Sequence, residues 1–284
     1  MNRLIIIIAS LLCSLQIFAQ NRRALVIGLG EQEDRHWAKI NGDKDVPYVK
    51  DMLISAGYKD ICTLVNKQAT KSGIVNAFYK LTRKCKAGDI VYIHFSGHGQ
   101  QVTDVNGDEV DGWDESWIPY HAYLEYGRND TGDKHLIDDE INSLLTVVKK
   151  KVGRNGRILV VVDACHSGGS TYSYNNDSLI NEVSDETIRG VKDEFVIPIY
   201  KRGNANKTTE RWLTLSACKD FQLNQELRNP KVGKLTYTLY SLTKRGNVTI
   251  DAIENFMSKY KSLLPQTPIL TGEIEKYNIS DFLK

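Results

Sequence analysis

Two short segments of this chain combine side chains that could carry out covalent chemistry. The segment SGHG at 96–99 follows an apolar run at 89–95, and the segment CHSG at 165–168 follows an apolar run at 157–164. A thiol and an imidazole within reach of each other form a nucleophile and its acid/base partner. The glycines beside them allow close backbone approach, so free N–H groups can face a developing oxyanion.

The two reactive candidates are His98 and Cys165. A lone cysteine after a strand is usually a small buried hydrophobe, and a lone histidine in a glycine-rich turn is usually structural. Their coincidence at two strand ends favours a reaction site instead. His166 is less suited as the partner because adjacent side chains in an extended turn point apart. His94 lies within an apolar run and is expected to be packed.

The elements that position these residues alternate between strand-like and helix-like segments. Strand-like runs lie at 24–29, 61–65, 89–95, 157–164 and 212–217, and the tail 265–272 adds an edge strand. This alternation predicts an α/β fold with a mostly parallel central sheet of about six strands and helices on both faces. Ligands of such sheets bind beyond the carboxyl ends of the strands, where His98 and Cys165 are expected.

Helices are expected between these strands. Asp45 and Pro47 open the first, Thr70 caps the second, and the last spans 250–264. The polar stretches 100–134 and 167–208 are expected to be two long functional loops. No composition break divides the chain, so 21–284 is predicted to be a single domain.

Composition narrows the class of protein. The chain has 284 residues, of which 41% are hydrophobic and 25% charged, and its formal net charge is +2. These values are ordinary for a globular protein and exclude a disordered tail or a collagen-like fibre. The charge balance gives no sign of a nucleic-acid partner.

The first twenty residues resemble a leader. Arg3 precedes a charge-free apolar stretch that ends at Ala19, the pattern of a secretory signal peptide; an uncleaved anchor is the alternative. We therefore expect a secreted or periplasmic protein with no stable membrane association after cleavage. In an oxidising compartment a Cys62–Cys85 disulfide is an open alternative.

The same motifs carry a family resemblance. SGHG at 96–99 and DACHSG at 163–168 resemble the histidine and cysteine motifs of metacaspases, the caspase-related cysteine peptidases. The acidic segment 104–119, LIDDEI at 136–141, LSACKDFQLNQE at 215–226 and GKLTYTLYSL at 233–242 are similar to further family segments. The resemblance is to type I metacaspases and covers about 23–272.

The resemblance implies the caspase–haemoglobinase fold and hydrolysis of peptide bonds after Arg or Lys. Cys165 is then the nucleophile and His98 its activating base, and the backbone N–H groups of Gly99 and Cys165 form the oxyanion hole. The pocket for the basic side chain falls on Asp45, Ser96 and Asp163. Asp45 is equally suited to capping the first helix ahead of Pro47, and both roles can hold.

The resemblance also implies calcium activation. Asp114, Asp138 and Asp139 match three calcium-binding carboxylates of the family, whereas Tyr172 stands where the family has a fourth acid. A competing site is Asp104, Asn106, Asp108 and Glu115, which follow EF-hand spacing with Glu109 in place of the required glycine. The alternative is a solvated acidic loop with Asp138 as a helix cap.

Basic residues within 167–208 suit an enzyme that cuts after Arg or Lys. Self-cleavage is predicted near Arg189–Lys192 or Lys201–Arg202, with an ordinary surface loop as the alternative. The leading function is thus a self-processing cysteine endopeptidase, expected to be a monomer acting on polypeptides with basic residues. The alternatives are a clostripain- or gingipain-like peptidase, or a catalytically silent calcium-binding protein on the same scaffold.

Overall fold

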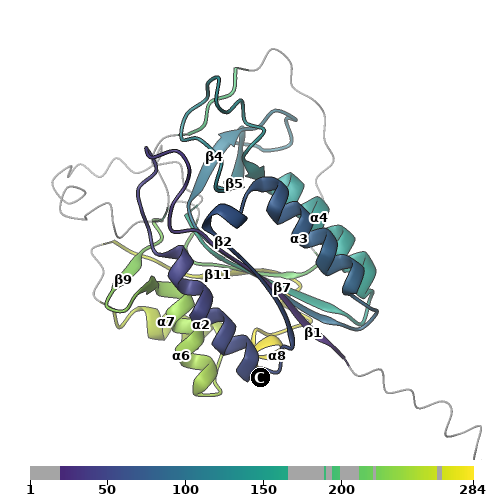
Figure 1. The fold of residues 1–284 in the computed structure, drawn as a ribbon. Helices are drawn as coiled ribbons and strands as arrows, with labels where there is room; N and C mark the ends of the chain where they lie inside the picture. Colours follow the sequence, from purple (N-terminus) through teal and green to yellow (C-terminus); the bar gives the residue numbers. More distant parts are fainter. Residues whose placement is uncertain (1–19, 166–188, 190–193, 199–210, 220–221, 261–263) are drawn as a thin grey trace, which may run out of the picture.

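The computed structural model describes residues 20–165, 189, 194–198, 211–219, 222–260 and 264–284. They form a central β-sheet with helices packed on both of its faces, and a smaller sheet beside one end of it (Figure 1). The predicted α/β fold is confirmed.

The central sheet has six strands in the order β11-β8-β7-β3-β1-β2. Their bounds are β1 Arg22–Gly28, β2 Asp60–Val65, β3 Ile90–Ser96, β7 Arg157–Asp163, β8 Leu213–Ser216 and β11 Ile269–Gly272. All neighbouring pairs are parallel except β11 with β8, which is antiparallel. The four inner strands are largely buried because helices cover both faces, which explains their continuous apolar sequences.

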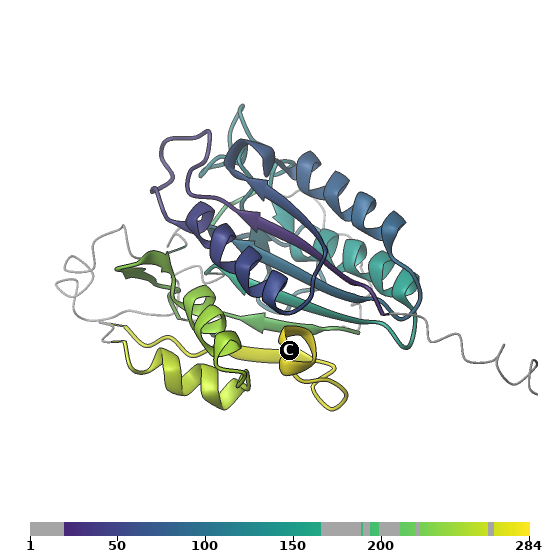
Figure 2. The same cartoon turned by 60° about the horizontal axis from the view of Figure 1, so that its bottom comes forward.

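The helices divide between the two faces of the sheet. Helices α3 (Lys71–Lys84) and α4 (Asp138–Val152) pack on one face. The opposite face is covered by α2 (Gly42–Ser55), α6 (Lys234–Lys244), α7 (Ile250–Met257) and α8 (Ser280–Leu283), as Figure 2 shows. Two hydrophobic cores therefore sandwich the sheet and fix its strand ends.

The polar stretch after β3 is more ordered than expected. It contains strands β4 (Gly99–Thr103), β5 (Trp113–Trp117) and β6 (Leu136–Ile137), which form a three-stranded antiparallel sheet. The prediction of one long loop over 100–134 was wrong because these strands are short and the polar residues between them mask their alternation. A hairpin of β9 (Glu226–Arg228) and β10 (Lys231–Gly233) leads into α6.

Several helix boundaries differ from expectation. Thr70 caps α3 as predicted, accepting a hydrogen bond from the Gly73 N–H. Helix α2 begins at Gly42, so Asp45 lies in its first turn and is not its cap. Helix α4 begins at Asp138 with Ile137 at the capping position, and α7 ends at Met257 instead of continuing to 264.

The leader-like segment 1–19 lies outside the described residues. Within the part of the chain that the structure describes, none of the helices has the length and apolar character needed to cross a bilayer. Cys62 and Cys85 are both free thiols here, so no Cys62–Cys85 disulfide is present.

Candidate active site

The register between β3 and β7 brings the two reactive segments together. These strands are parallel neighbours, and Ser96 of β3 is paired with Asp163 of β7. His98 and Cys165 each follow two residues later, so both leave the sheet at the same edge. Adjacent strands lie about 4.8 Å apart. The sequence prediction that both residues emerge at one edge is therefore correct.

His98 is held in one tautomer. Its Nε2 donates to the carbonyl oxygen of Ala38 at 2.8 Å, and its ring packs against Trp37 with 5.0 Å between ring centroids. A carbonyl can only accept, so Nε2 carries the proton and Nδ1 presents its lone pair. Among the described residues Nδ1 has no partner. Burial lowers the pKa of His98 to about 4, and the positive charge of Arg189 acts in the same direction.

Cys165 lies two residues beyond the end of β7, and its side chain is fully buried. The backbone N–H of Asn224 donates to its Sγ at 2.6 Å. The Sγ–H also donates to the Asn224 carbonyl oxygen, with 3.9 Å between Sγ and that oxygen. The backbone N–H of Cys165 donates in turn to the carbonyl oxygen of Arg189 at 2.7 Å.

Arg189 occupies an acidic pocket beside Cys165. Its Nη1 lies 2.7 Å from Oδ2 of Asp45 and 3.3 Å from Oδ1 of Asp163, and its Nε donates to Oε1 of Glu226 at 2.9 Å. Nη1 also donates to the carbonyl oxygen of Asp163 at 3.0 Å. The backbone N–H of Arg189 donates to the Asn224 carbonyl at 3.0 Å. One arginine is thus bound through its side chain, N–H and carbonyl together.

The pocket is buried, and its electrostatics follow from that. Burial opposes the charge of Arg189, but the three carboxylates raise its pKa well above the usual value. The pKa of Asp163 is lowered although burial acts against this, because Arg189, Thr236 and Asn224 stabilise the carboxylate. Burial raises the pKa of Asp45 to about 6; Arg189 opposes the shift.

Neighbouring groups fix the pocket's two aspartates. Asp45 accepts from the backbone N–H of Gly233 at 2.8 Å, and Asp163 accepts from the Thr236 hydroxyl at 2.6 Å and its N–H at 2.9 Å. A Cβ on Gly233 would lie 2.7 Å from Nη1 of Arg189 and 2.3 Å from Asp163. Glycine at this position therefore lets the guanidinium approach the carboxylates.

The predicted pocket residues have different surroundings. Asp45 and Asp163 both lie beside the guanidinium of Arg189. The hydroxyl of Ser96 instead bonds Nε2 of His94 at 2.8 Å, and His94 is packed in the core as expected. Gly99 begins β4, paired with Trp117. Glu226 was not anticipated; only an acidic residue within the family-like segment 215–226 could have signalled it.

The acidic segment forms a cluster that only partly follows the expected calcium ligands. Asp104, Asp108 and Asp114 each place a carboxylate oxygen within 4.8 Å of the others. Burial raises the pKa of Asp114 to about 8, with Asp138 and then Asp104 as the next causes. The negative charges of Asp138 and Asp139 thus act on Asp114 and raise its pKa further. Tyr172 lies outside the described residues.

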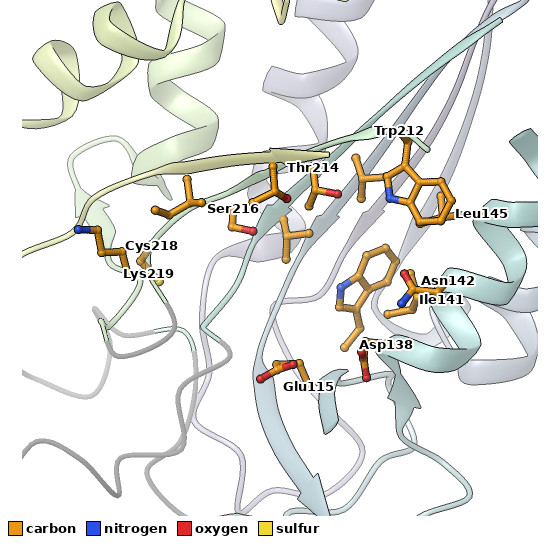
Figure 3. Close-up of a pocket in the computed structure, with 15 residues that line it drawn as sticks. Glu115, Asp138, Ile141, Asn142, Leu145, Trp212, Thr214, Ser216, Cys218 and Lys219 are labelled. Carbon is orange, nitrogen blue, oxygen red and sulfur yellow. The ribbon is translucent and has the colours of Figure 1, made fainter. Parts of the chain in front are cut away.

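A separate pocket lies between α4 and the β7-β8-β11 side of the sheet (Figure 3). Trp117 and Trp212 line it, with Glu115, Asp138 and Cys218 at its polar parts. Neither His98 nor Cys165 belongs to its lining. Glu115 lines this cavity together with Asp138, and it is not among the carboxylates that meet at Asp104, so the fourth member of the EF-hand-like set lies apart from the other acids.

The strand order, with His98 after β3 and Cys165 after β7, is that of a caspase-like α/β protein. The sequence profile of the family described as "Metacaspase, peptidase C14 domain" matches residues 22–172. This is more than half of the chain, so the chain belongs to the metacaspase family of cysteine-type peptidases. The predicted family is confirmed, and both His98 and Cys165 lie within the matched range.

Individual relatives agree with this placement. The chain is 28% identical to "Metacaspase-1" of Eremothecium gossypii over 258 residues, covering 83% of this chain and 54% of the relative. It is 25% identical to "Metacaspase-1" of Coccidioides immitis, with 82% and 51% covered. The chain thus spans about half the length of the curated relatives it matches.

Two solved structures share the fold. A protein of Geobacter sulfurreducens is 25% identical, with a TM-score of 0.64, and 93% of this chain and 97% of that chain are covered. Caspase-1 from Spodoptera frugiperda is 11% identical, with a TM-score of 0.56 and coverage of 89% and 86%. The second likeness concerns the fold alone, and it confirms the caspase-like architecture.

Proposed function

We propose that this chain is a cysteine endopeptidase that cleaves polypeptides after Arg or Lys. The observation that carries the proposal is the position of Arg189, whose side chain sits among three carboxylates while its carbonyl accepts the N–H of Cys165. This is how a substrate's basic residue would bind beside the nucleophile. Acidic residues would be repelled by the same carboxylates.

The geometry supports a Cys/His mechanism. Nδ1 of His98, which has no partner among the described residues, takes the proton of the Cys165 thiol, and the thiolate attacks the carbonyl carbon of the basic residue. The oxyanion accepts a hydrogen bond from the backbone N–H of Cys165, and the backbone N–H of Gly99 is the second proposed donor. His98 then passes its proton to the leaving amine as the C–N bond breaks, and water hydrolyses the resulting thioester to release the acid and restore the thiol.

The same arrangement supports self-processing after Arg189. Its carbonyl is already bound to the N–H of Cys165, so the bond between Arg189 and Gly190 is the one presented for attack. Until that bond is cut, the side chain of Arg189 excludes other substrates from the pocket. The alternative sites near Lys192, Lys201 and Arg202 lie outside the described residues.

Peptide reporters and intact mass test the proposal together. The purified full chain is expected to release a new fragment beginning at Gly190 and to cleave reporters ending in Arg or Lys, but not those ending in Asp. Cys165→Ala should abolish both reactions. Absence of all turnover under reducing conditions, with and without calcium, would instead favour a catalytically silent protein. Nicking that persists in Cys165→Ala would remove Cys165 as the nucleophile.

We also propose that a divalent cation, calcium by the chemistry of its ligands, binds at Asp104, Asp108 and Asp114. The donors are hard carboxylate oxygens on a loop and a strand end, which suits this ion. Asp114 is only 2% exposed, and its Oδ1 has no hydrogen-bond partner among the described residues. A buried carboxylate in that state needs a proton or a cation. Asp138 and Asp139 add negative charge nearby.

Thermal unfolding with calcium and with chelator tests this site. Calcium should raise the Tm of the Cys165→Ala chain, and Asp114→Asn should remove most of that rise. Asp133→Asn, an exposed loop control, should keep it. An equal Tm in calcium and chelator would contradict the cation site without touching the peptidase proposal.

The export of the chain is a further proposal. It rests on Arg3 and the apolar stretch up to Ala19. Expression with the leader should yield a secreted or periplasmic chain whose first residue lies near position 21. Retention of residues 1–20 in a membrane fraction would support the anchor instead.

A further inference from the structure

We infer that Glu226 selects arginine over lysine in the acidic pocket. The inference rests on the proposed peptidase function and adds a specificity-determining residue to it. The three carboxylates bind two different nitrogens of Arg189. Its Nη1 end faces Asp45 and Asp163, whereas its Nε–H faces Glu226 alone among the three carboxylates.

The two basic side chains differ at the point where Glu226 binds. Arginine carries an N–H at Nε, one bond before the guanidinium carbon, and this N–H donates to Oε1 of Glu226 at 2.9 Å. Lysine has a methylene along this part of its chain and a single ammonium at the tip. The ammonium lies near the position of the guanidinium carbon, so all three carboxylates still attract it, but it has no N–H at the Nε position to donate to Oε1 of Glu226.

Glu226 is fixed by groups other than the bound arginine. The backbone N–H of Asn41 donates to Oε1 at 2.6 Å, and the Asn41 side-chain amide bonds Oε2. Glu226 also pairs with Gly233 in the β9–β10 hairpin, and Gly233 forms the adjacent pocket wall. The carboxylate is therefore held in place before a substrate arrives, and it cannot turn to follow a lysine ammonium without losing these bonds.

Burial makes the difference energetically important. With Arg189 in the pocket the Glu226 side chain is 1% exposed, so its bond to the Nε–H forms away from bulk water. Hydrogen bonds to charged groups contribute about 1.5–3 kcal/mol, which corresponds to roughly a 10- to 150-fold difference in equilibrium constant. Asp45 and Asp163 face the terminal nitrogen, which arginine and lysine both provide, so they attract either residue. Glu226, the third carboxylate, distinguishes arginine from lysine.

Matched reporters that differ only in Arg or Lys at the cleaved position test the inference on the self-processed full chain. The wild type should have a higher kcat/KM for Arg than for Lys by about tenfold or more. Glu226→Gln should reduce this ratio by about tenfold, mainly through loss of Arg turnover, while Lys turnover stays within a few fold. Glu226→Asp should recover part of the Arg preference. Glu254→Gln, on the exposed side of α7, is the matched control and should leave the ratio unchanged.

Self-cleavage provides a second measurement that needs no added substrate. Arg189→Lys should slow cleavage at residue 189 in the wild-type background and have little further effect in the Glu226→Gln background. Such a double-mutant cycle isolates the pairing of Glu226 with the Nε–H.

Each outcome decides one question. An unchanged Arg-to-Lys ratio in an active Glu226→Gln chain would overturn the inference while the peptidase function stands. Equal loss of both substrates would also overturn it, because Glu226 would then merely support the pocket. No turnover of either reporter by the wild type would refute the peptidase function itself.

Discussion

The backbone N–H of Cys165 donates to the carbonyl oxygen of Arg189 over 2.7 Å. The residue proposed as the nucleophile therefore binds the peptide group that follows Arg189. The guanidinium of the same arginine is completely buried among carboxylates. Arg189 thus occupies the pocket that we propose for the basic residue of a substrate.

Replacement of Arg189 should destabilise the uncleaved chain. In a Cys165→Ala background, Arg189→Gln leaves Asp45, Asp163 and Glu226 without their cation. Loss of one partner from a buried ion pair costs about 3–5 kcal/mol, and the Tm in a calorimetric scan should fall accordingly. A small guanidinium compound such as agmatine should raise the Tm of this variant more than that of its Cys165→Ala parent. Equal effects on both would show that the pocket does not bind guanidinium groups.

The pH dependence of substrate binding should report Asp45. Burial raises the pKa of Asp45 to about 6, so its carboxylate is charged above that pH and protonated below it. This value holds with a guanidinium in the pocket, so the occupied pocket loses one negative charge as the pH falls through about 6, and the KM for Arg reporters should rise. Asp45→Asn should have a higher KM that no longer varies over this range. If the variant keeps the same acidic limb, a different group titrates.

The Thr236 hydroxyl should act by positioning the pocket. It donates to Asp163 at 2.6 Å and also lies 3.2 Å from Oδ2 of Asp45 and 3.2 Å from Nε2 of His94. Thr236→Val keeps the shape but removes this donor. Since a hydrogen bond to a charged group contributes about 1.5–3 kcal/mol, KM for Arg and Lys reporters should rise together by about tenfold or more. Thr236→Ser should restore most of the binding, and a change in kcat alone would contradict a positioning role.

The strand ends were predictable because they depend on local patterns. Continuous apolar runs predict buried parallel strands, and the topology of such sheets places strand ends at one edge. His98 and Cys165 follow directly from that rule, whereas Asp163 was expected at the pocket only through the family resemblance. The three short strands beside the acidic cluster were missed, since β6 has two residues and its pairing with β5 depends on contacts that are distant in sequence.

The composition of the pocket was harder to predict. Glu226 and Arg189 are 37 positions apart and meet only through the fold. An arginine in a polar stretch is expected to be solvated, since charged side chains are rarely buried without partners. The sequence thus indicated Arg189 as a cleavage candidate, but no local pattern showed that its side chain would occupy the acidic pocket. The role of Asp45 was only partly predictable. An acidic residue suits both the start of a helix and a cation site, and the contacts of Asp45 with Gly233 and Arg189 favour the cation site.

The protonation of His98 should depend on whether Arg189 occupies the pocket. In the uncleaved Cys165→Ala chain, burial lowers the pKa of His98 to about 4, and the charge of Arg189 lowers it further. Nitrogen-15 NMR should therefore show a neutral His98 ring above about pH 5, protonated at Nε2 by its bond to Ala38. Arg189→Gln removes the positive charge, so the pKa should move upward towards its ordinary value. A His98 ring protonated at Nδ1, or one whose pKa is unaffected in Arg189→Gln, would contradict the coupling between the general base and the occupied pocket.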